Sequence, residues 1–170
     1  KGNIRELIAK RMEEEGSKCK CITCREIGLK QIKKEVDLQK LDIDIKSIKY
    51  KSSDGIEYFI SAEDKYSKSI IGFVRMRIPS KDAHRKEIDD RTAIIRELHV
   101  YGQVVPIGKR DNKSWQHKGI GAELMSEAEK IAKEELSMKK IVVISAIGTR
   151  EYYKKLNYEL EGPYMSKFTI

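Results

Sequence analysis

The segment that most constrains the fold is a glycine-rich turn between an apolar segment and an amphipathic helix. The turn has the form Gln116-x-x-Gly119-x-Gly121 and lies within WQHKGIGAELM, residues 115–125. Apolar residues at helical spacing follow it and predict a helix over about 119–136. The apolar segment AIIRELHVYG, which predicts a strand, ends shortly before it. A helix start with unhindered N–H groups binds anions, typically a phosphate, so we expect a phosphate-bearing ligand here.

The remaining periodicity predicts a sheet with helices around it. Strands are expected at 43–51, 56–64, 69–78, 93–102 and 140–146, with one or two more within 158–169. Helices are expected at 3–15, 119–136 and 149–156. Residues 79–92 are polar and predict a long loop, and the basic stretch REIGLKQIKKE shows no clear periodicity. This order predicts an α/β or α+β fold with a mixed central sheet and flanking helices.

Length and charge limit the class of protein. The chain has 170 residues, which is one ordinary domain with room for a small appendage. Its formal net charge of +8 suits a polyanionic partner. No apolar run is long enough to cross a membrane, so no membrane partner is expected. The chain begins Lys1-Gly2 without a Met, so we expect a fragment of a longer protein.

Three cysteines form the cluster Cys19-x-Cys21-x-x-Cys24. Cysteines confined to one short segment are not a secreted disulfide pattern, so a cytoplasmic protein is expected. Three neighbouring thiolates favour a soft metal, and structural Zn²⁺ with a fourth ligand is the usual answer. The fourth ligand is expected to be His84, His99 or a residue outside this chain. An iron–sulfur cluster and free thiols remain alternatives.

The N-terminal segment carries most of the excess positive charge. Residues 1–34 contain ten Lys or Arg against five Glu. As a set beside the cysteines, they predict a surface that reads nucleic-acid phosphates. The candidate residues are Arg5, Lys10, Arg11, Lys18, Lys20, Arg25, Lys30, Lys33 and Lys34. A rival interpretation places that surface on the loop at 79–92, around Lys81, Arg85 and Lys86. For any single residue, a solvated surface charge remains the alternative.

The glycine-rich turn resembles the pyrophosphate loop of the GCN5-related N-acetyltransferases. It lacks the Lys-Ser/Thr of a nucleoside triphosphate loop and the third glycine of a dinucleotide fingerprint. The segments RELHVYG, WQHKGIGAELMSEAEKIA, ISAIGTREYYKKLNYELEGPYM and CKCITCREIG resemble one group within that family. This group is the acetyltransferase half of the Elongator catalytic subunits, the tRNA carboxymethyluridine synthases. The resemblance covers nearly the whole chain, but the group's radical SAM motif, Cys-x-x-x-Cys-x-x-Cys, is not in this sequence.

The resemblance implies a fold, a division into parts and a function. It implies a GCN5-related N-acetyltransferase fold over 41–170, preceded by a helical, zinc-binding linker over 1–40. It implies acetyl-CoA as cofactor and, in a full-length protein, an iron–sulfur cluster and S-adenosylmethionine in a radical SAM domain. The implied reaction adds a carboxymethyl group at C5 of the tRNA wobble uridine, with cleavage of the thioester.

The resemblance also implies partners, and two other functions stay open beside it. The implied partners are tRNA, the missing radical SAM domain, and other Elongator subunits or a second copy of the chain. A protein lysine N-acetyltransferase, acting on histones for example, is the first alternative. A non-catalytic RNA-binding module that holds acetyl-CoA only as a ligand is the second.

Site residues follow from the same resemblance. The cofactor would contact the backbone of the turn and the main chain of the preceding strand. These residues are Leu98, His99, Val100, Gln116, His117, Lys118, Gly119, Ile120 and Gly121. Tyr152 and Tyr153 would lie near the acyl group and the CoA sulfur, with Tyr153 favoured as the proton donor to the thiolate. Glu97 and His99 share the other face of the strand and are candidates for a base or for positioning a water. Solvated side chains for His117 and Lys118, and simple packing for one tyrosine, are the alternatives.

Overall fold

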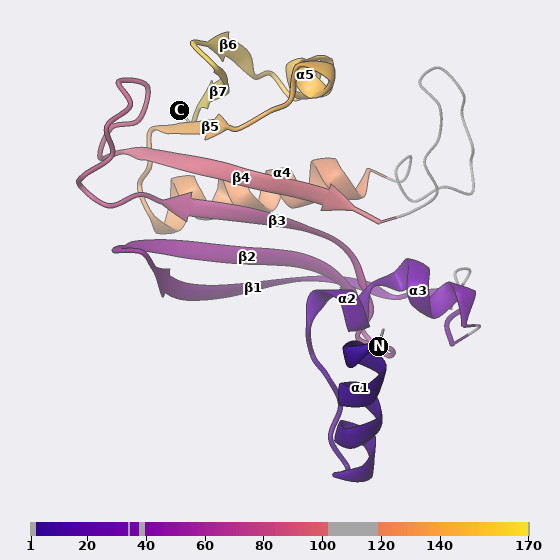
Figure 1. Cartoon of the computed structure of the whole chain (residues 1–170). Helices are drawn as coiled ribbons and strands as arrows, with labels where there is room; N and C mark the ends of the chain where they lie inside the picture. The colour runs from indigo at the N-terminus through magenta and orange to yellow at the C-terminus, as the bar shows by residue number, and fades with distance from the viewer. Residues whose placement is uncertain (1–2, 34, 38–39, 102–118, 170) are drawn as a thin grey trace.

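A seven-stranded mixed sheet forms the body of the protein (Figure 1). The computed structural model describes residues 3–33, 35–37, 40–101 and 119–169. The strands lie in the order β1-β2-β3-β4-β5-β7-β6. Their bounds are β1 Ile43–Ser52, β2 Gly55–Asp64, β3 Ile70–Ile78, β4 Thr92–Val100, β5 Lys140–Val143, β6 Glu159–Glu161 and β7 Tyr164–Phe168. The strands expected from the sequence are therefore confirmed, with both of the closing strands present.

Neighbouring strands run antiparallel except at one place. The first four form a meander, and β7 pairs antiparallel with both β5 and β6. Among the seven strands that the structure describes, β4 and β5 alone pair in parallel. A parallel pair needs a crossover connection, and α4 (Ile120–Lys130) lies on that crossover. The strand expected to be buried on both faces, β5, is buried at all four of its residues.

The core lies between the sheet and α4, which is behind the sheet in Figure 1. Leu124, Met125 and Ala128 of α4 are almost fully buried, as the apolar spacing of this segment predicts. The helix continues into the π-helical turn η3, Ile131–Glu135. The helix expected over 119–136 is therefore present, but its last part is wound more loosely. A π-turn accommodates one extra residue, and here Ile131 and Ala132 both stay buried in the core.

The short helix expected at 149–156 is also present. The chain makes a 3-10 turn, η4 (Ile147–Thr149), and then α5, Arg150–Lys154. A helix of five residues has little stability of its own, so tertiary contacts must hold it in place. Tyr153 is its one buried residue. This residue therefore anchors α5 to the core.

Three short helices precede the sheet. They are α1 (Ile4–Glu14), α2 (Ile22–Arg25) and α3 (Ile27–Ile32). No residue of α1 is buried, and the helix extends away from the sheet (Figure 1). The helices α2 and α3 differ from expectation, because this stretch showed no periodicity. They are too short to display an apolar stripe, and Ile27 alone enters the core.

Polar contacts fasten α2 and α3 to the sheet. Arg25 pairs with Glu63 of β2 at 2.5 Å and donates to the Lys68 carbonyl at 3.0 Å. Lys30 donates to the Ser67 carbonyl at 2.9 Å.

Within the described part of the chain, no helix is long and apolar enough to cross a membrane.

Candidate functional site

The parallel strands β4 and β5 separate along their length. They pair from Thr92 opposite Lys140 to Ile95 opposite Val143, and the Ile144 N–H donates to the Ile95 carbonyl at 3.0 Å. Beyond this point β4 continues to Val100 and pairs only with β3, as far as the described residues show. The sheet therefore opens at one end, between β4 and the chain that follows β5.

A β-bulge lies where the strands separate. Ile95 pairs with Met76 of β3, but Glu97 pairs with Arg75, so Arg96 is an extra residue on β4. Side chains alternate between the two faces of a strand, and the extra residue inverts that alternation. Beyond the bulge, Leu98 and Val100 consequently pack on the α4 side, where both contact the core.

A cavity of about 390 Å³ lies at this opening, between β4 and the start of α4. This cavity, the slot, is lined by Leu98, Val100, Gly119, Gly121, Ala122, Thr149, Tyr152 and Tyr153. Six of these eight residues were expected from the sequence at the cofactor or beside its acyl group. The structure thus brings together the strand, the turn and the short helix, which are separated in the chain.

Both glycines at the start of α4 have a physical reason. Gly119 precedes the helix with φ of +80°, a left-handed conformation that favours glycine. A Cβ at Gly121 would lie 2.7 Å from Tyr152 Oη and 3.6 Å from Val100 Cγ2. A side chain there would therefore fill the slot. The first N–H groups of α4 have no side-chain cap, and an 11-residue helix beginning beside a cavity suits an anion.

Tyr152 and Tyr153 form an edge-to-face pair with ring centroids 5.2 Å apart. Tyr153 is buried, and Tyr152 is 38% exposed. Burial raises the pKa of Tyr152 above its usual value. Burial and the neighbouring Tyr152 raise the pKa of Tyr153 to about 12. Both phenols therefore keep their protons at neutral pH and can donate hydrogen bonds into the cavity.

Contacts through Tyr158 hold Tyr153 in place. The Tyr158 ring packs edge-on against the Tyr153 ring, with the two ring centroids 6.0 Å apart. The Tyr158 N–H donates to the Tyr153 carbonyl at 3.1 Å. Tyr158 Oη donates to Glu129 Oε1 of α4 at 2.8 Å. Lys167 of β7 donates to the other oxygen of Glu129 at 2.7 Å. These contacts tie α5 to both α4 and β7, so the short helix has a fixed place beside the slot.

Glu97 and His99 lie on the other face of β4, as expected. Glu97 is 3.7 Å from Arg75 in an ion pair. The centroid of the His99 ring lies 5.8 Å from that of the stacked Phe73 ring and 4.5 Å from that of the Tyr101 ring. Neither side chain lines the cavity. For either side chain to act on the thioester, the reacting atoms would have to lie in the opening between β4 and β5, where both faces of β4 can be reached.

Several positions at the slot were not singled out from the sequence. Ala122 and Thr149 line the cavity. Ser145 follows the last rung between β4 and β5, and its buried Oγ has no hydrogen-bond partner within the described residues. Thr149 stands directly before the REYYK segment, a position that could have signalled it. No sequence pattern marks Ser145, because an unpartnered hydroxyl is visible only in three dimensions.

The cysteines converge as expected. The sulfurs of Cys19, Cys21 and Cys24 lie within 4.8 Å of one another, and all three residues are exposed. A Zn–S bond of about 2.3 Å in a tetrahedral site gives sulfur separations compatible with this cluster. Among the described residues no fourth histidine, cysteine or carboxylate joins it, so neither His84 nor His99 is in place as a ligand.

The cysteine thiols differ in how readily they lose their protons. The Cys24 N–H and the thiols of Cys19 and Cys24 stabilise the Cys21 thiolate, and they lower the pKa of Cys21 to about 7. Hydrogen bonds to Cys21 and Cys19 raise the pKa of Cys24 to about 11. Three adjacent thiolates repel one another, so full ionisation needs a bound cation. This donor set fits Zn²⁺ with one further ligand.

The candidate phosphate-binding residues fall into two groups. Those that are exposed are Arg5, Lys10, Arg11, Lys18, Lys20 and Lys33. Arg25 and Lys30 are partly buried and already bond to the sheet. Lys34, together with Gln116, His117 and Lys118 of the glycine-rich turn, lies outside the described residues. Lys81, Arg85 and Lys86 of the rival loop are exposed.

Comparison with known proteins gives close relatives over the whole chain. The chain is 49% identical to the tRNA uridine(34) acetyltransferase of Methanocaldococcus jannaschii, over 99% of this chain and 31% of the relative. It is 46% identical to Elongator complex protein 3 of Saccharomyces cerevisiae, over 98% of this chain and 30% of the relative. The chain thus spans about a third of the length of these relatives.

A solved structure and a family model agree with this. The structure of archaeal Elp3 from Methanocaldococcus infernus matches with a TM-score of 0.86 and 46% identity, over 99% of this chain and 39% of that one. The fold expected from the resemblance is thereby confirmed. A family model described as Acetyltransferase (GNAT) family matches residues 28–158, which include the bulge, the slot and the tyrosine pair. The chain belongs to the GNAT acetyltransferase family.

Proposed function

We propose that this chain binds acetyl-CoA in the slot between β4 and α4 and cleaves its thioester in the service of tRNA modification. The modified base would be the wobble uridine, which receives a carboxymethyl group at C5. The observation that carries the proposal is the cavity where two glycines, an open strand and two protonated tyrosines meet. The names of the relatives, which include a tRNA uridine(34) acetyltransferase, support the substrate.

The slot suits each part of the cofactor in turn. The start of α4, with Gly119 and Gly121, offers N–H groups to the pyrophosphate. The main chain of Leu98 and Val100, unpaired with β5, offers an edge to the amides of the pantetheine arm. The family to which the chain belongs supports acetyl-CoA rather than another phosphate ligand.

The tyrosines determine what the slot can do to the thioester. A CoA thiol has a pKa near that of a cysteine thiol, about 8.5. Complete transfer of a proton from Tyr153, whose pKa is about 12, to the thiolate would be uphill. Tyr153 would instead act by donating a hydrogen bond to the departing sulfur, with Tyr152 nearer the acyl group. Glu97 or His99, on the opposite face of β4 from the slot, would act as a base or position a water for the cleavage.

The cysteine cluster and the basic residues would serve the nucleic-acid side. We propose that Cys19, Cys21 and Cys24 hold a structural Zn²⁺, with the fourth ligand from outside the described residues. Residues 1–40 would form a linker that presents the exposed lysines and arginines to tRNA, and 41–170 would be the acetyl-CoA domain. The full-length protein would add a radical SAM domain with an iron–sulfur cluster and S-adenosylmethionine. We expect it in the cytoplasm, working with other Elongator subunits or as a homodimer.

Release of free CoA tests the function. This chain is incubated with acetyl-CoA alone, with tRNA, or with histone peptides, and again together with the remaining part of a full-length relative. The proposal expects release that depends on tRNA and is unaffected by peptides. Release with peptides but not tRNA would replace it with a lysine N-acetyltransferase, a function that the acetyltransferase family name also admits. Tight acetyl-CoA binding without release under any condition would leave only a non-catalytic RNA-binding module.

Metal content tests the cysteine assignment separately. We expect about one zinc per chain by elemental analysis of the purified protein, and a marked loss in Cys21→Ser. Acetyl-CoA affinity should stay unchanged in this variant, because the cysteines do not line the slot. Iron in place of zinc, or equal zinc in both proteins, would contradict the assignment.

A further inference from the structure

A row of aromatic rings crosses the face of the sheet opposite α4. The rings of Phe59 on β2 and Phe73 on β3 are stacked, with their centroids 5.1 Å apart. The Phe73 ring is stacked in turn with that of His99, its cross-strand partner on β4, at 5.8 Å between centroids. Tyr101, just after β4, has its ring centroid 4.5 Å from that of His99. The row therefore runs from β2 to β4, toward the edge of β4 that separates from β5.

The outer rings of this row are accessible. In Figure 1, α4 lies behind the sheet, and none of the described helices lies in front of β2, β3 and β4. His99 is exposed, and Phe59 and Tyr101 are partly buried. Phe73, between its two stacked neighbours, is only 4% exposed. The buried ring thus supports the others, and the His99 ring is the most open surface of the row.

The stack ends at His99 because β4 has no partner strand there. Among the described residues, β5 pairs with β4 only as far as Ile95, so His99 has no cross-strand neighbour on that side. A flat group placed beside His99 would continue the row as a ring on a further strand would. Leu98 and Val100, on either side of His99 in the chain, line the slot from the other face of β4. The end of the aromatic row and the slot therefore meet at one opening.

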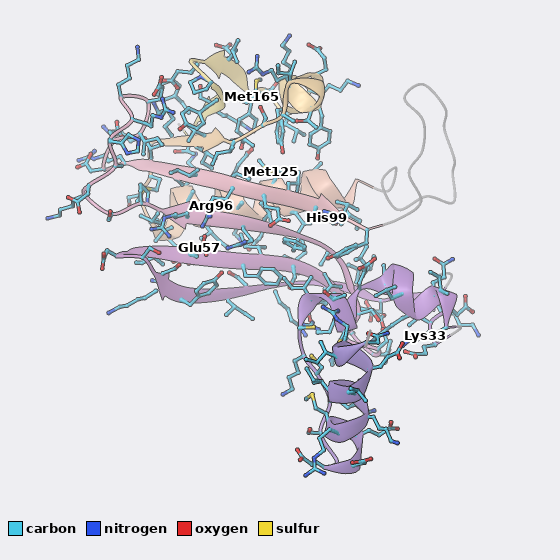
Figure 2. The ribbon with its side chains drawn as sticks, in the orientation of Figure 1. Lys33, Glu57, Arg96, His99, Met125 and Met165 are labelled. Atoms are coloured by element: carbon cyan, nitrogen blue, oxygen red, sulfur yellow. The ribbon has the colours of Figure 1, made fainter. Side chains whose placement is uncertain are left out.

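Two arginines lie on the same face, and the carboxylate that holds them is buried. Arg75 of β3 and Arg96 of β4 both pair with Glu57, whose side chain is 2% exposed, while the two arginine side chains are partly exposed. Arg75 also pairs with Glu97 at 3.7 Å. Figure 2 labels Glu57, Arg96 and His99 across the sheet. A guanidinium group has five N–H donors, so each arginine keeps donors for a further acceptor such as a phosphate of RNA.

We propose that this face of the sheet stacks unpaired bases of the tRNA substrate, with one base lying on His99 beside the slot. Proteins bind single-stranded RNA by stacking its bases on aromatic side chains and by placing cations along its phosphates. A base that undergoes chemistry must also leave its own stack, and enzymes hold such a base against aromatic side chains. The aromatic row and the two arginines supply both kinds of contact next to the slot. The inference rests on the proposed function and adds the place where its RNA substrate lies.

The test measures the binding of a short single-stranded oligouridine to the chain and to three variants. His99→Ala removes the ring, whereas His99→Phe keeps a flat ring that can stack but cannot take up a proton. Tyr66→Ala is the matched control, because Tyr66 is an 80% exposed aromatic residue in the turn between β2 and β3. Titrations at several salt concentrations give the affinity and its salt dependence. NMR signals of the His99 ring protons report stacking directly in the unchanged chain.

We expect His99→Ala to weaken oligouridine binding by about 10-fold, which is within the range for the loss of one base–aromatic stack. The slope of log affinity against log salt should stay the same, because stacking releases no counterion. His99→Phe and Tyr66→Ala should stay within about twofold of the unchanged chain, since each keeps the row of rings. The His99 ring-proton signals should move upfield when oligouridine is added. Acetyl-CoA affinity should not change in these variants, because neither side chain lines the slot.

Three results would overturn the inference. Unchanged oligouridine affinity in His99→Ala, or no binding to the unchanged chain, would show that RNA does not stack here and would leave this face to a protein partner. Equal losses in His99→Phe and His99→Ala would show that a flat ring is not what binds the base. A loss together with a salt slope lower by about 0.7 would place a phosphate rather than a base on His99. The ring-proton signals need no variant, so they decide the question even if His99→Ala is unstable.

Release of CoA separates this inference from the proposed function. Stacking on His99 without tRNA-dependent release of CoA would refute the proposed function and keep the inference. Release of CoA that depends on tRNA, together with unchanged oligouridine affinity in His99→Ala, would keep the proposed function and refute the inference.

Discussion

The slot and the N-terminal segment are built in opposite ways. Around the slot, Tyr153, Leu124 and Ile120 are buried, and β4, α4 and α5 all contact the core. In the N-terminal segment, over the described residues 3–33, α1 has no buried residue, the cysteines are exposed, and Ile27 alone is buried. The difference indicates that the shape of the slot is specified by the fold itself. In the N-terminal segment, by contrast, α2 and α3 are held to the sheet mainly by polar contacts of Arg25 and Lys30, and α1 has no buried residue.

The largest expected effect lies at the slot. Gly121→Glu should weaken acetyl-CoA binding by about 100-fold or more, because it places a negative side chain beside the pyrophosphate and against Tyr152. Calorimetry measures the affinity, and circular dichroism checks that the fold is kept. Zinc content should not change. Unaltered acetyl-CoA affinity would show that the cofactor does not occupy this slot and would break the comparison.

The next effect concerns chemistry rather than binding. Tyr153→Phe should lower kcat for thioester cleavage by about 100-fold with little change in acetyl-CoA affinity, since the ring stays and only the hydroxyl is removed. Tyr152→Phe is the matched control on the same helix and should lower kcat less. Rates from single-turnover CoA release give the measurement. The assignment of roles is reversed if the two variants exchange their effects.

The N-terminal segment should respond through nucleic acid alone. Reversing Lys20 and Lys33 to Glu should weaken tRNA binding and lower the log–log salt slope by about two units, because each lysine would neutralise one phosphate. Both side chains are exposed, so the fold should be unaffected. Titrations at several salt concentrations provide the slope. The control reverses Arg85 and Lys86 in the rival loop, and a larger effect there would move the tRNA surface to that loop.

The smallest effect tests the junction between the two regions. Burial favours protonation of Glu63, but Arg25, Ser61 and Lys46 outweigh it and hold its pKa below the usual range. A carboxyl group whose pKa is lowered by folding adds stability above its unfolded pKa of about 4.3, and this stability is lost as the pH falls through the folded value.

Glu63→Gln should therefore be less stable than the unchanged chain at pH 7, and the difference should shrink as the pH falls from about 4.3 through the lowered pKa of Glu63. Urea unfolding across this pH range measures the difference. The Arg25 contact also predicts faster proteolysis of residues 3–33 in the variant at pH 7. A constant stability difference at every pH would exclude Glu63 as the titrating link.

Local patterns account for what the sequence revealed. The glycine-rich turn and the strands each occupy a short stretch whose spacing carries the signal, as for Gly119 and Gly121, whereas the tyrosine pair was expected from the family resemblance. The bulge at Arg96 could not be predicted from the sequence, because it is defined by the pairing of β4 with β3 rather than by a local pattern. The helices α2 and α3 were missed because contacts of Ile27 and Arg25 with distant strands hold them, rather than their own periodicity.

The separation of β4 from β5 has a consequence for the protein without its cofactor. A strand with unpaired N–H and C=O groups is a template for joining another chain, and most such strands lie at the margin of a sheet. Here that template lies in the middle of the sheet, over Glu97–Val100. Acetyl-CoA would cover it much as an added strand does. Cofactor supply would then protect the protein from self-association as well as feed its chemistry.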